Sequence, residues 1–137
     1  MKQLVLFCLI LITVLSCKQL DQDPVTADPL YRKWKLIETK SRTGDWETAS
    51  YQSVIEFRPN GRILNHTNGR PCCSPVQVDR QLNTLKVTQI YACPEALCVK
   101  LSAYQIVSLT ANELILDSVY EYTNLNGHVS MKYILMN

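Results

Sequence analysis

Apolar and polar residues alternate in a series of short segments between residues 31 and 136. These segments are rich in β-branched and aromatic residues and are separated by turn-forming residues, a pattern typical of β-strands. No stretch of convincing length has apolar residues at helical spacing. We therefore expect an all-β chain with eight strands, at 31–42, 52–58, 62–66, 75–81, 85–91, 99–109, 114–122 and 128–136.

The alternation also predicts which side chains face the interior. In the first segment Trp34 and Leu36 share one face, and the flanking lysines share the other. In the second segment Ile55 and Phe57 face inward while Glu56 faces out. Trp34 can plug one end of a barrel, because a buried tryptophan covers on the order of 200 Å².

Turn residues arrange these strands as a meander. Pro59-Asn60-Gly61 and Asn83-Thr84 each separate two segments, and Asn-Gly favours the positive φ angles of a tight hairpin. The segment 99–109 departs from strict alternation, which suggests a bulge. Eight consecutive antiparallel strands favour an up-and-down barrel, because closure removes exposed edges. Such a barrel is filled by its own side chains or holds one small ligand, so the fold leaves both possibilities open.

The first 17 residues have the proportions of an export signal. Lys2 precedes an apolar run over residues 4–15, which is too short for a membrane-spanning helix of roughly 20 residues. Residues 14–17, Val-Leu-Ser-Cys, resemble the lipobox of bacterial lipoproteins, where cleavage precedes a cysteine that is then acylated. We expect a signal peptide over 1–16 and an acyl-modified (palmitate-type) N-terminus at Cys17; the alternative is an ordinary secretory signal with an incidental cysteine.

The segment after Cys17 predicts how the protein is held in the cell. Residues 17–29 are the lipidated N-terminus and a polar, proline-containing tether, and residues 30–137 form one domain. Two or three acyl chains hold a protein on a membrane, because each methylene group buried in the bilayer contributes about 0.8 kcal/mol to the free energy of membrane binding. Asp21 and Asp23 resemble export tags of some Gram-negative surface lipoproteins. We therefore expect a protein anchored in the outer membrane of the cell envelope, on either its periplasmic or its surface face.

Four cysteines remain in the predicted domain, and export takes them to an oxidising compartment. A bridge between the adjacent pair Cys72-Cys73 is disfavoured because it strains the intervening peptide. We expect two disulfides that join this pair to Cys93 and Cys98, with the connectivity left open. The alternative is a Cys₄ zinc site, although the adjacent pair lacks the usual ligand spacing.

Charge and motifs exclude several classes of function. Loss of Lys2 with the signal leaves thirteen basic residues against twelve acidic ones, without the concentrated basic patch of nucleic-acid-binding proteins. No Gly-x-Ser-x-Gly, His-Glu-x-x-His or glycine-rich phosphate motif is present, and we expect both His66 and His128 at the surface. We therefore expect a monomer that is not an enzyme and has no metal or cofactor. No protein partner is indicated.

The chain resembles lipocalin-like lipoprotein domains over most of residues 30–136. Residues 30–36, Leu-Tyr-Arg-Lys-Trp-Lys-Leu, are similar to the opening Leu-x-Gly-x-Trp-x-Leu of such domains, with Arg32 at the glycine position. Residues 55–61 are similar to their Ile-x-Phe-x-x-[Asn/Asp]-Gly hairpin. Further similarity is carried by Gly44-Asp45-Trp46, by Tyr104-Gln105-Ile106 with Leu109, and by residues 113–116. The resemblance implies a small anchored barrel and a role in binding.

We expect a small apolar ligand in the barrel. The alternative is a solid-core barrel that acts as a structural or inhibitor-like interaction module through its disulfide-clamped loops. For an apolar residue that faces inward, we expect a role in core packing before a role in lining a cavity. Tyr120 and Tyr122 are the better candidates for lining the cavity or its mouth. The candidate cavity residues are Trp34, Leu36, Ile55, Phe57, Tyr104, Leu114, Leu116, Tyr120 and Tyr122.

Overall fold

The computed structural model describes residues 28–121 and 129–136, and over these residues it contains strands and no helix. The predicted signal peptide, Cys17, nearly all of the tether, Tyr122 and His128 lie outside the described residues. The strands are β1 (Lys33–Ser41), β2 (Glu47–Thr48), β3 (Val54–Phe57), β4 (Ile63–Asn65), β5 (Ser74–Gln81), β6 (Thr84–Tyr91), β7 (Leu101–Leu109), β8 (Glu113–Tyr120) and β9 (Val129–Leu135).

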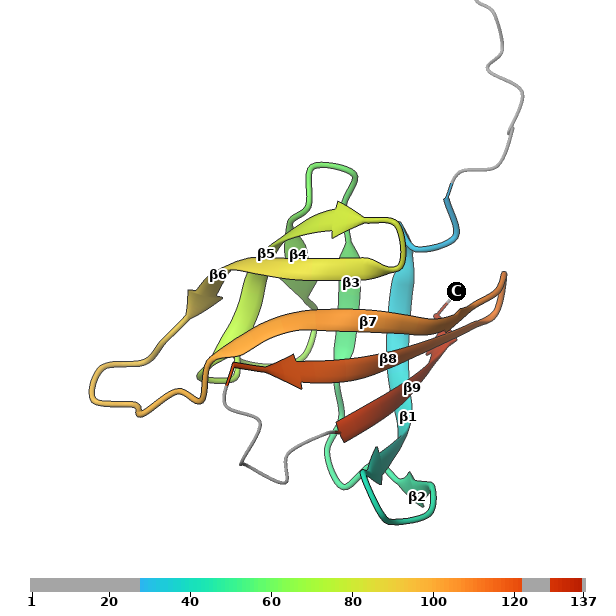
Figure 1. Cartoon of the computed structure of the whole chain (residues 1–137), viewed down its shortest axis with the longest axis horizontal. Helices are drawn as coiled ribbons and strands as arrows, with labels where there is room; N and C mark the ends of the chain where they lie inside the picture. Colours follow the sequence, from blue (N-terminus) through green and yellow to red (C-terminus); the bar gives the residue numbers. More distant parts are fainter. Residues whose placement is uncertain (1–27, 122–128, 137) are drawn as a thin grey trace, which may run out of the picture.

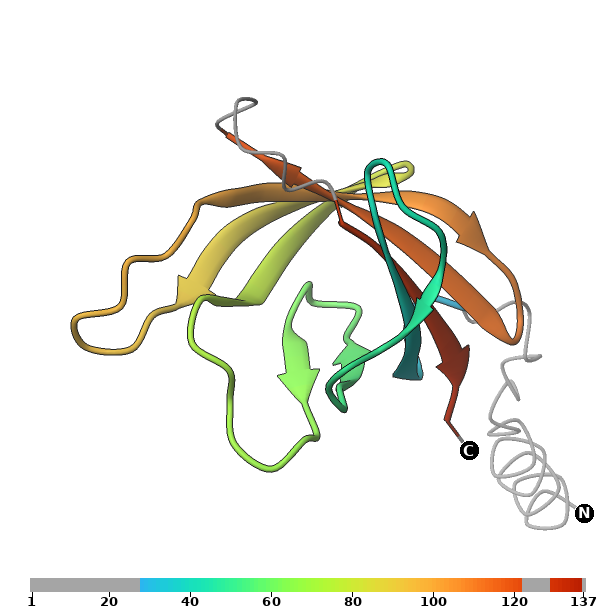
Figure 2. The same ribbon diagram turned by 90° about the horizontal axis from the view of Figure 1, so that it is seen from below.

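The strands form one antiparallel sheet in the order β4-β3-β1-β9-β8-β7-β6-β5, with β2 paired to β1 (Figure 1). Its two outer strands, β4 and β5, meet along a seam, so the sheet curls round on itself (Figure 2). At the seam Arg62 bridges to Gln77, and the Val78 amide donates to the Gly61 carbonyl at 2.9 Å. This confirms the predicted eight-stranded up-and-down barrel, which is nearly closed.

Local details differ from the sequence prediction in two places. β2 lies in a stretch where no strand was predicted, and its two residues pair with Glu38 and Thr39. The β5–β6 turn is Leu82-Asn83 rather than Asn83-Thr84, because Thr84 pairs with Gln81. Leu82 takes a φ of 55° and is 91% exposed, a conformation that sequence reasoning assigns to Gly or Asn. The predicted bulge in β7 is confirmed by register shifts against β8.

The barrel interior is packed with the residues that the alternation predicts. The tightest packing is around Trp34, which is fully buried, and Leu36, which is 4% exposed. The charged residues beside them on β1 face outward. The other buried members of this core are Leu30, Phe57, Ile63, Val78, Leu85, Ile106, Leu114, Leu116, Met131 and Tyr133.

Glu56 departs from the prediction, since it is only 8% exposed although it is on the outward face of β3. Two neighbours cover its carboxylate: His66 Nε2 lies 2.7 Å from Oε2, and the Arg58 guanidinium lies 2.9 Å from Oε1. An ion pair of this kind allows a carboxylate to be buried, because it replaces lost hydration. His66 is at the surface, as predicted.

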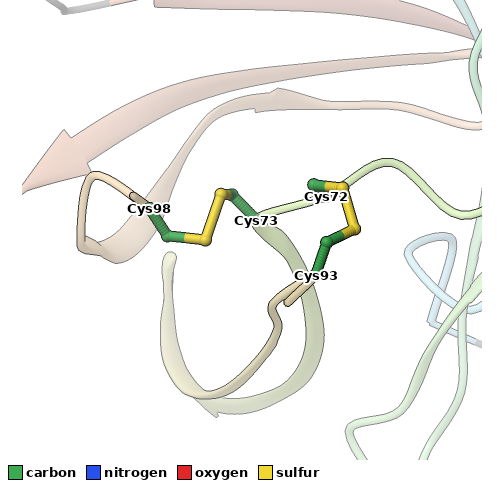
Figure 3. The surroundings of a disulfide bond; sticks show 4 residues. All are labelled: Cys72, Cys73, Cys93 and Cys98. Carbon is green, nitrogen blue, oxygen red and sulfur yellow. A yellow bond between two sulfur atoms is a disulfide. The ribbon is translucent and has the colours of Figure 1, made fainter. Parts of the chain in front are cut away.

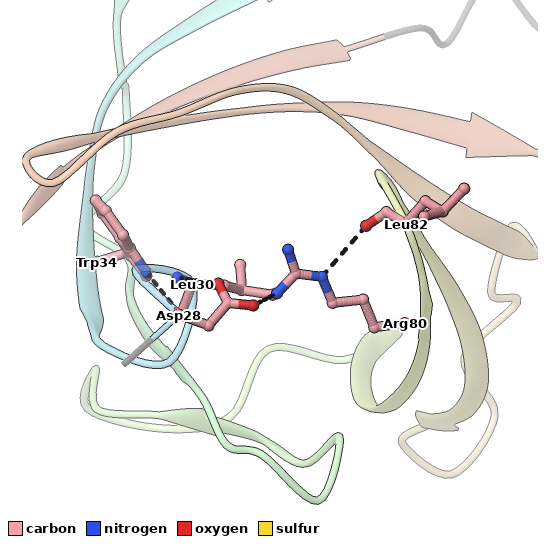
Figure 4. A network of polar contacts seen from close by, with 5 residues as sticks. All are labelled: Asp28, Leu30, Trp34, Arg80 and Leu82. Carbon is pink, nitrogen blue, oxygen red and sulfur yellow. Dashed lines mark hydrogen bonds and ion pairs between the residues drawn. The ribbon is translucent and has the colours of Figure 1, made fainter. Parts of the chain in front are cut away.

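The barrel end at which β1 begins is plugged by the residues before that strand, and we call it the plugged end (Figure 4). Trp34 Nε1 donates to the Leu30 carbonyl at 3.0 Å, and the Leu30 amide donates to Asp28 Oδ1 at 3.0 Å. The same Asp28 forms an ion pair with Arg80 of β5. The strap of residues 28–32 is thus tied both to the plug and to the wall of the barrel.

Gly61 is required at the seam, which gives a direct test of barrel closure. Its φ is +79°, and an added Cβ would lie 2.1 Å from the Val78 carbonyl oxygen. Gly69 has a similar φ of +83° but nothing within 4 Å. We expect Gly69→Ala to cost about 1 kcal/mol from backbone strain alone, and Gly61→Ala to cost at least about 1 kcal/mol more because the seam must open. Urea unfolding of the two variants measures the difference; equal costs would contradict a tight seam.

Candidate ligand cavity

A cavity of about 540 Å³ lies inside the barrel, at the end opposite the plug. Its lining residues come from β3, β4, β5, β7, β8 and β9, so it is surrounded by the wall rather than set into its outer surface. We call this end, where β1 finishes at Ser41, the open end. The lining residues are Tyr51, Ser53, Ile55, Ile63, Asn65, Arg70, Pro71, Cys72, Cys73, Ser74, Pro75, Val76, Leu97, Val99, Leu101, Tyr104, Ser118, Tyr120, Val129, Met131 and Tyr133.

Two disulfides clamp the loops beside the mouth of this cavity (Figure 3). Cys72 is bonded to Cys93, and Cys73 is bonded to Cys98, with Cα–Cα distances of 5.3 and 5.2 Å. This confirms that the adjacent pair is joined to the 93–98 loop, and it supplies the connectivity that the sequence left open. All four cysteines are used in disulfides, so they are not available as the alternative Cys₄ zinc site.

Tyrosines form the polar part of the cavity wall. Burial raises the pKa of Tyr104 and that of Tyr133 well above the usual value, and the neighbouring phenols raise them further. Burial, and then Tyr120, also raises the pKa of Tyr51. Because a raised pKa keeps a phenol protonated, these groups are neutral hydrogen-bonding groups at physiological pH. The Tyr133 hydroxyl donates to Met131 Sδ at 3.4 Å.

Two further groups in the wall are polar and stand out from their surroundings. The Ser74 hydroxyl is buried and has no hydrogen-bond partner within the described residues. Arg70 lies at the exposed side of the cavity, with its guanidinium 5.2 Å from the centre of the Tyr91 ring. The cavity is therefore apolar and aromatic over most of its wall, with a small number of polar anchor points.

The structure separates the predicted cavity residues into two groups. Ile55, Tyr104 and Tyr120 line the cavity. Trp34, Leu36, Leu114, Leu116 and Phe57 are packed in the core and do not line it. For these residues core packing is the better description, although Phe57 also lines a second hollow at the seam. Tyr122 is outside the described residues.

The cavity wall also contains residues outside the set that the sequence predicts. Met131 and Tyr133 alternate on the inner face of β9, and that alternation was a usable signal. Tyr51, Arg70 and Ser74 lie in loops or at a strand end, where no periodicity marks a buried face. The positions of Arg70 and Ser74 depend on the neighbouring disulfides at Cys72 and Cys73.

A second hollow of about 530 Å³ lies at the seam near the plugged end. Phe57, Leu30 and Leu85 form its apolar part. Its charged and amide groups already have protein partners, since Arg80 pairs with Asp28 and Gln77 Nε2 donates to the Asn60 carbonyl. This hollow therefore offers a ligand fewer unused polar groups than the cavity at the open end.

The fold and cavity define a class of protein: a small all-β, disulfide-bonded barrel with an internal cavity at one end. Within residues 28–121 and 129–136, no helix is long and apolar enough to cross a membrane. In the same ranges no group of three or more His, Cys, Asp or Glu residues could hold a metal ion. Comparison of the chain with protein-family models, curated proteins and solved structures gave no match.

Proposed function

We propose that this protein is a membrane-anchored, lipocalin-like lipoprotein that binds a small apolar molecule inside its barrel. The observation that carries the proposal is the cavity of about 540 Å³, because ligand sites are concave, largely apolar and roughly 300–1,000 Å³ in volume. The plug closes one end, so the disulfide-clamped end is the entrance along the barrel axis. Such a site favours a compact ligand that enters from the disulfide side.

The sequence before residue 28 supports the anchor. The lipobox-like residues 14–17 provide Cys17 for acylation, and the tether joins the barrel at Asp28. Asp28 is at the plugged end, where it pairs with Arg80. The mouth of the cavity is thus at the opposite end of the barrel from Asp28, where the tether is attached. The attachment of the tether therefore does not block the mouth.

Binding is tested with a fluorescent apolar probe such as N-phenyl-1-naphthylamine. Ser118 is 2% exposed and lines the cavity, so Ser118→Phe places an aromatic ring in the space that the ligand needs. We expect saturable probe binding in the unchanged protein and its loss in this variant. Val107→Phe is the matched control, because Val107 is 58% exposed on the outside of β7. Unchanged binding by folded Ser118→Phe would place the probe elsewhere and contradict the proposal.

Anchoring is tested by Cys17→Ser. We expect the variant to leave the membrane fraction, because serine cannot take the thioether-linked diacylglyceryl group whose acyl chains provide the membrane affinity. The measurement is fractionation of host cells followed by immunoblotting, with Cys8→Ser inside the predicted signal as the control. Retention of Cys17→Ser on membranes would contradict lipidation.

A second candidate function is an interaction module, and one observation favours it. Leu97 is 99% exposed in the loop held at both ends by Cys93 and Cys98, and a rigid loop with an apolar tip suits a protein partner. Leu97 also lines the cavity, so Leu97→Asp is compared with Ser118→Phe, which fills the cavity without changing this loop. If the loop docks a partner, this variant loses co-purification of that partner from envelope extracts while Ser118→Phe retains it.

A further inference from the structure

The charges around the cavity are unequal. Among the described residues that line it, Arg70 is the one side chain charged at neutral pH, and none is Asp or Glu. The nearby tyrosines add no negative charge, because burial keeps them protonated. The wall therefore offers a positive group at its exposed side and neutral groups elsewhere.

Arg70 is positioned to receive an acceptor from outside the protein. Its guanidinium carbon lies over the Tyr91 ring, 5.2 Å from the ring centre, and this cation–π contact uses none of its N–H donors. No carboxylate within the described residues forms an ion pair with it. Glu121, also at the open end, is paired with Lys100 instead. Arg70 thus retains its full charge and its hydrogen-bond donors.

Ser74 supplies a second polar contact, four residues along the same segment. Its hydroxyl is buried without a partner among the described residues, and a buried hydroxyl without a hydrogen bond is unfavourable. A ligand whose polar head reaches this hydroxyl as well as Arg70 removes this cost. Most of the remaining wall is apolar or aromatic and suits a hydrocarbon chain.

We propose that the cavity takes a single-chain anionic amphiphile, whose acidic head is held by Arg70 and whose chain fills the barrel. This inference rests on the proposed function and names its ligand class. A cationic head would find Arg70 and no acidic partner, so the site disfavours it. A ligand with a neutral head group would cover the mouth and shield Arg70 from water without providing a counterion, which is unfavourable for a charged side chain.

Three amphiphiles with the same chain test the sign of the head group: dodecanoate and dodecyltrimethylammonium, each below its micelle concentration, and dodecanol below its solubility limit. Displacement of N-phenyl-1-naphthylamine from the full domain measures their affinities. We expect dodecanoate to bind most tightly and the cation least. Equal binding of all three, or tighter binding of the cation, would overturn the inference and leave the proposed function standing. Absence of binding by the probe and by all three would instead contradict the proposed function.

Arg70→Gln tests the residue. We expect it to weaken dodecanoate binding about fivefold, the scale of one partly exposed charge pair, and to leave dodecanol binding unchanged. Arg42→Gln removes the same charge at the same end of the barrel, but Arg42 does not line the cavity, so it serves as the control. If both variants weaken dodecanoate binding equally, the preference for an anionic head group comes from the net charge of the protein, and the role of Arg70 is overturned. Equal weakening of dodecanol by Arg70→Gln would show a packing defect and also overturn it.

Discussion

Loss of both disulfides is expected to lower the free energy of unfolding by about 5 kcal/mol. The bridges close loops with sequence separations of 21 and 25 residues, and each restricts the unfolded chain. A small domain whose stability is typically 5–15 kcal/mol would be marginal without them. The measurement is urea unfolding of the oxidised protein and of the variant with all four cysteines replaced by serine. Equal midpoints would contradict a stabilising role.

Removal of one bridge is expected to cost less than half of that total. The two disulfide loops overlap along the chain. When the Cys72–Cys93 bridge is intact, Cys73 is already held close to Cys98, because Cys72 adjoins Cys73 and Cys93 precedes Cys98 by five residues. The remaining loop is short, and short loops have less closure entropy to remove. We therefore expect Cys73→Ser/Cys98→Ser and Cys72→Ser/Cys93→Ser each to cost about 2 kcal/mol. Strictly additive costs would contradict this coupling.

Trp34→Ala is expected to destabilise the protein by about 3–5 kcal/mol, the usual cost of removing a buried tryptophan. Trp34 is fully buried, and its indole donates to the Leu30 carbonyl. Its loss therefore leaves a cavity and an unpaired acceptor, and it also releases the strap that Asp28 ties to Arg80. Urea unfolding followed by circular dichroism measures the cost without depending on tryptophan fluorescence.

Trp46 provides the control for this experiment, since the chain has two tryptophans. It is half-buried beside Lys132, whose Nζ is 4.6 Å from the ring. We expect Trp46→Ala to cost about 1 kcal/mol, the scale of one exposed cation–π contact. Similar costs for the two variants would show that Trp34 is not the central residue of the plug.

The barrel could be predicted because its two main signals are local. The alternation of Trp34 with Leu36 and of Ile55 with Phe57 assigns each strand a buried face, and the Asn60-Gly61 turn fixes one hairpin. The Leu82-Asn83 turn could not be assigned, because the pairing of Gln81 with Thr84 places an exposed leucine at positive φ. In that case sheet register overrides the preference of a single residue.

The cavity was harder to predict than the fold. Periodicity shows that a residue faces inward, but it does not show whether the space beyond it is filled. Leu114 and Tyr120 share the inner face of β8, yet Leu114 is in the core and Tyr120 lines the cavity. The difference arises from distance along the barrel axis. Arg70 and Ser74 depend on loop positions that are fixed by the disulfides, and no local pattern carries that information.

The seam between β4 and β5 makes the barrel wall uneven in its resistance to opening. The β1–β9, β5–β6 and β7–β8 pairs extend along most of each strand, whereas here the described contacts centre on the Arg62–Gln77 bridge and the Gly61–Val78 hydrogen bond. Regions with few main-chain hydrogen bonds open locally at low free-energy cost. The β3–β4 side of this seam is therefore the part of the wall where local opening is expected to cost least, while the β5–β9 meander is held by its own strand pairs.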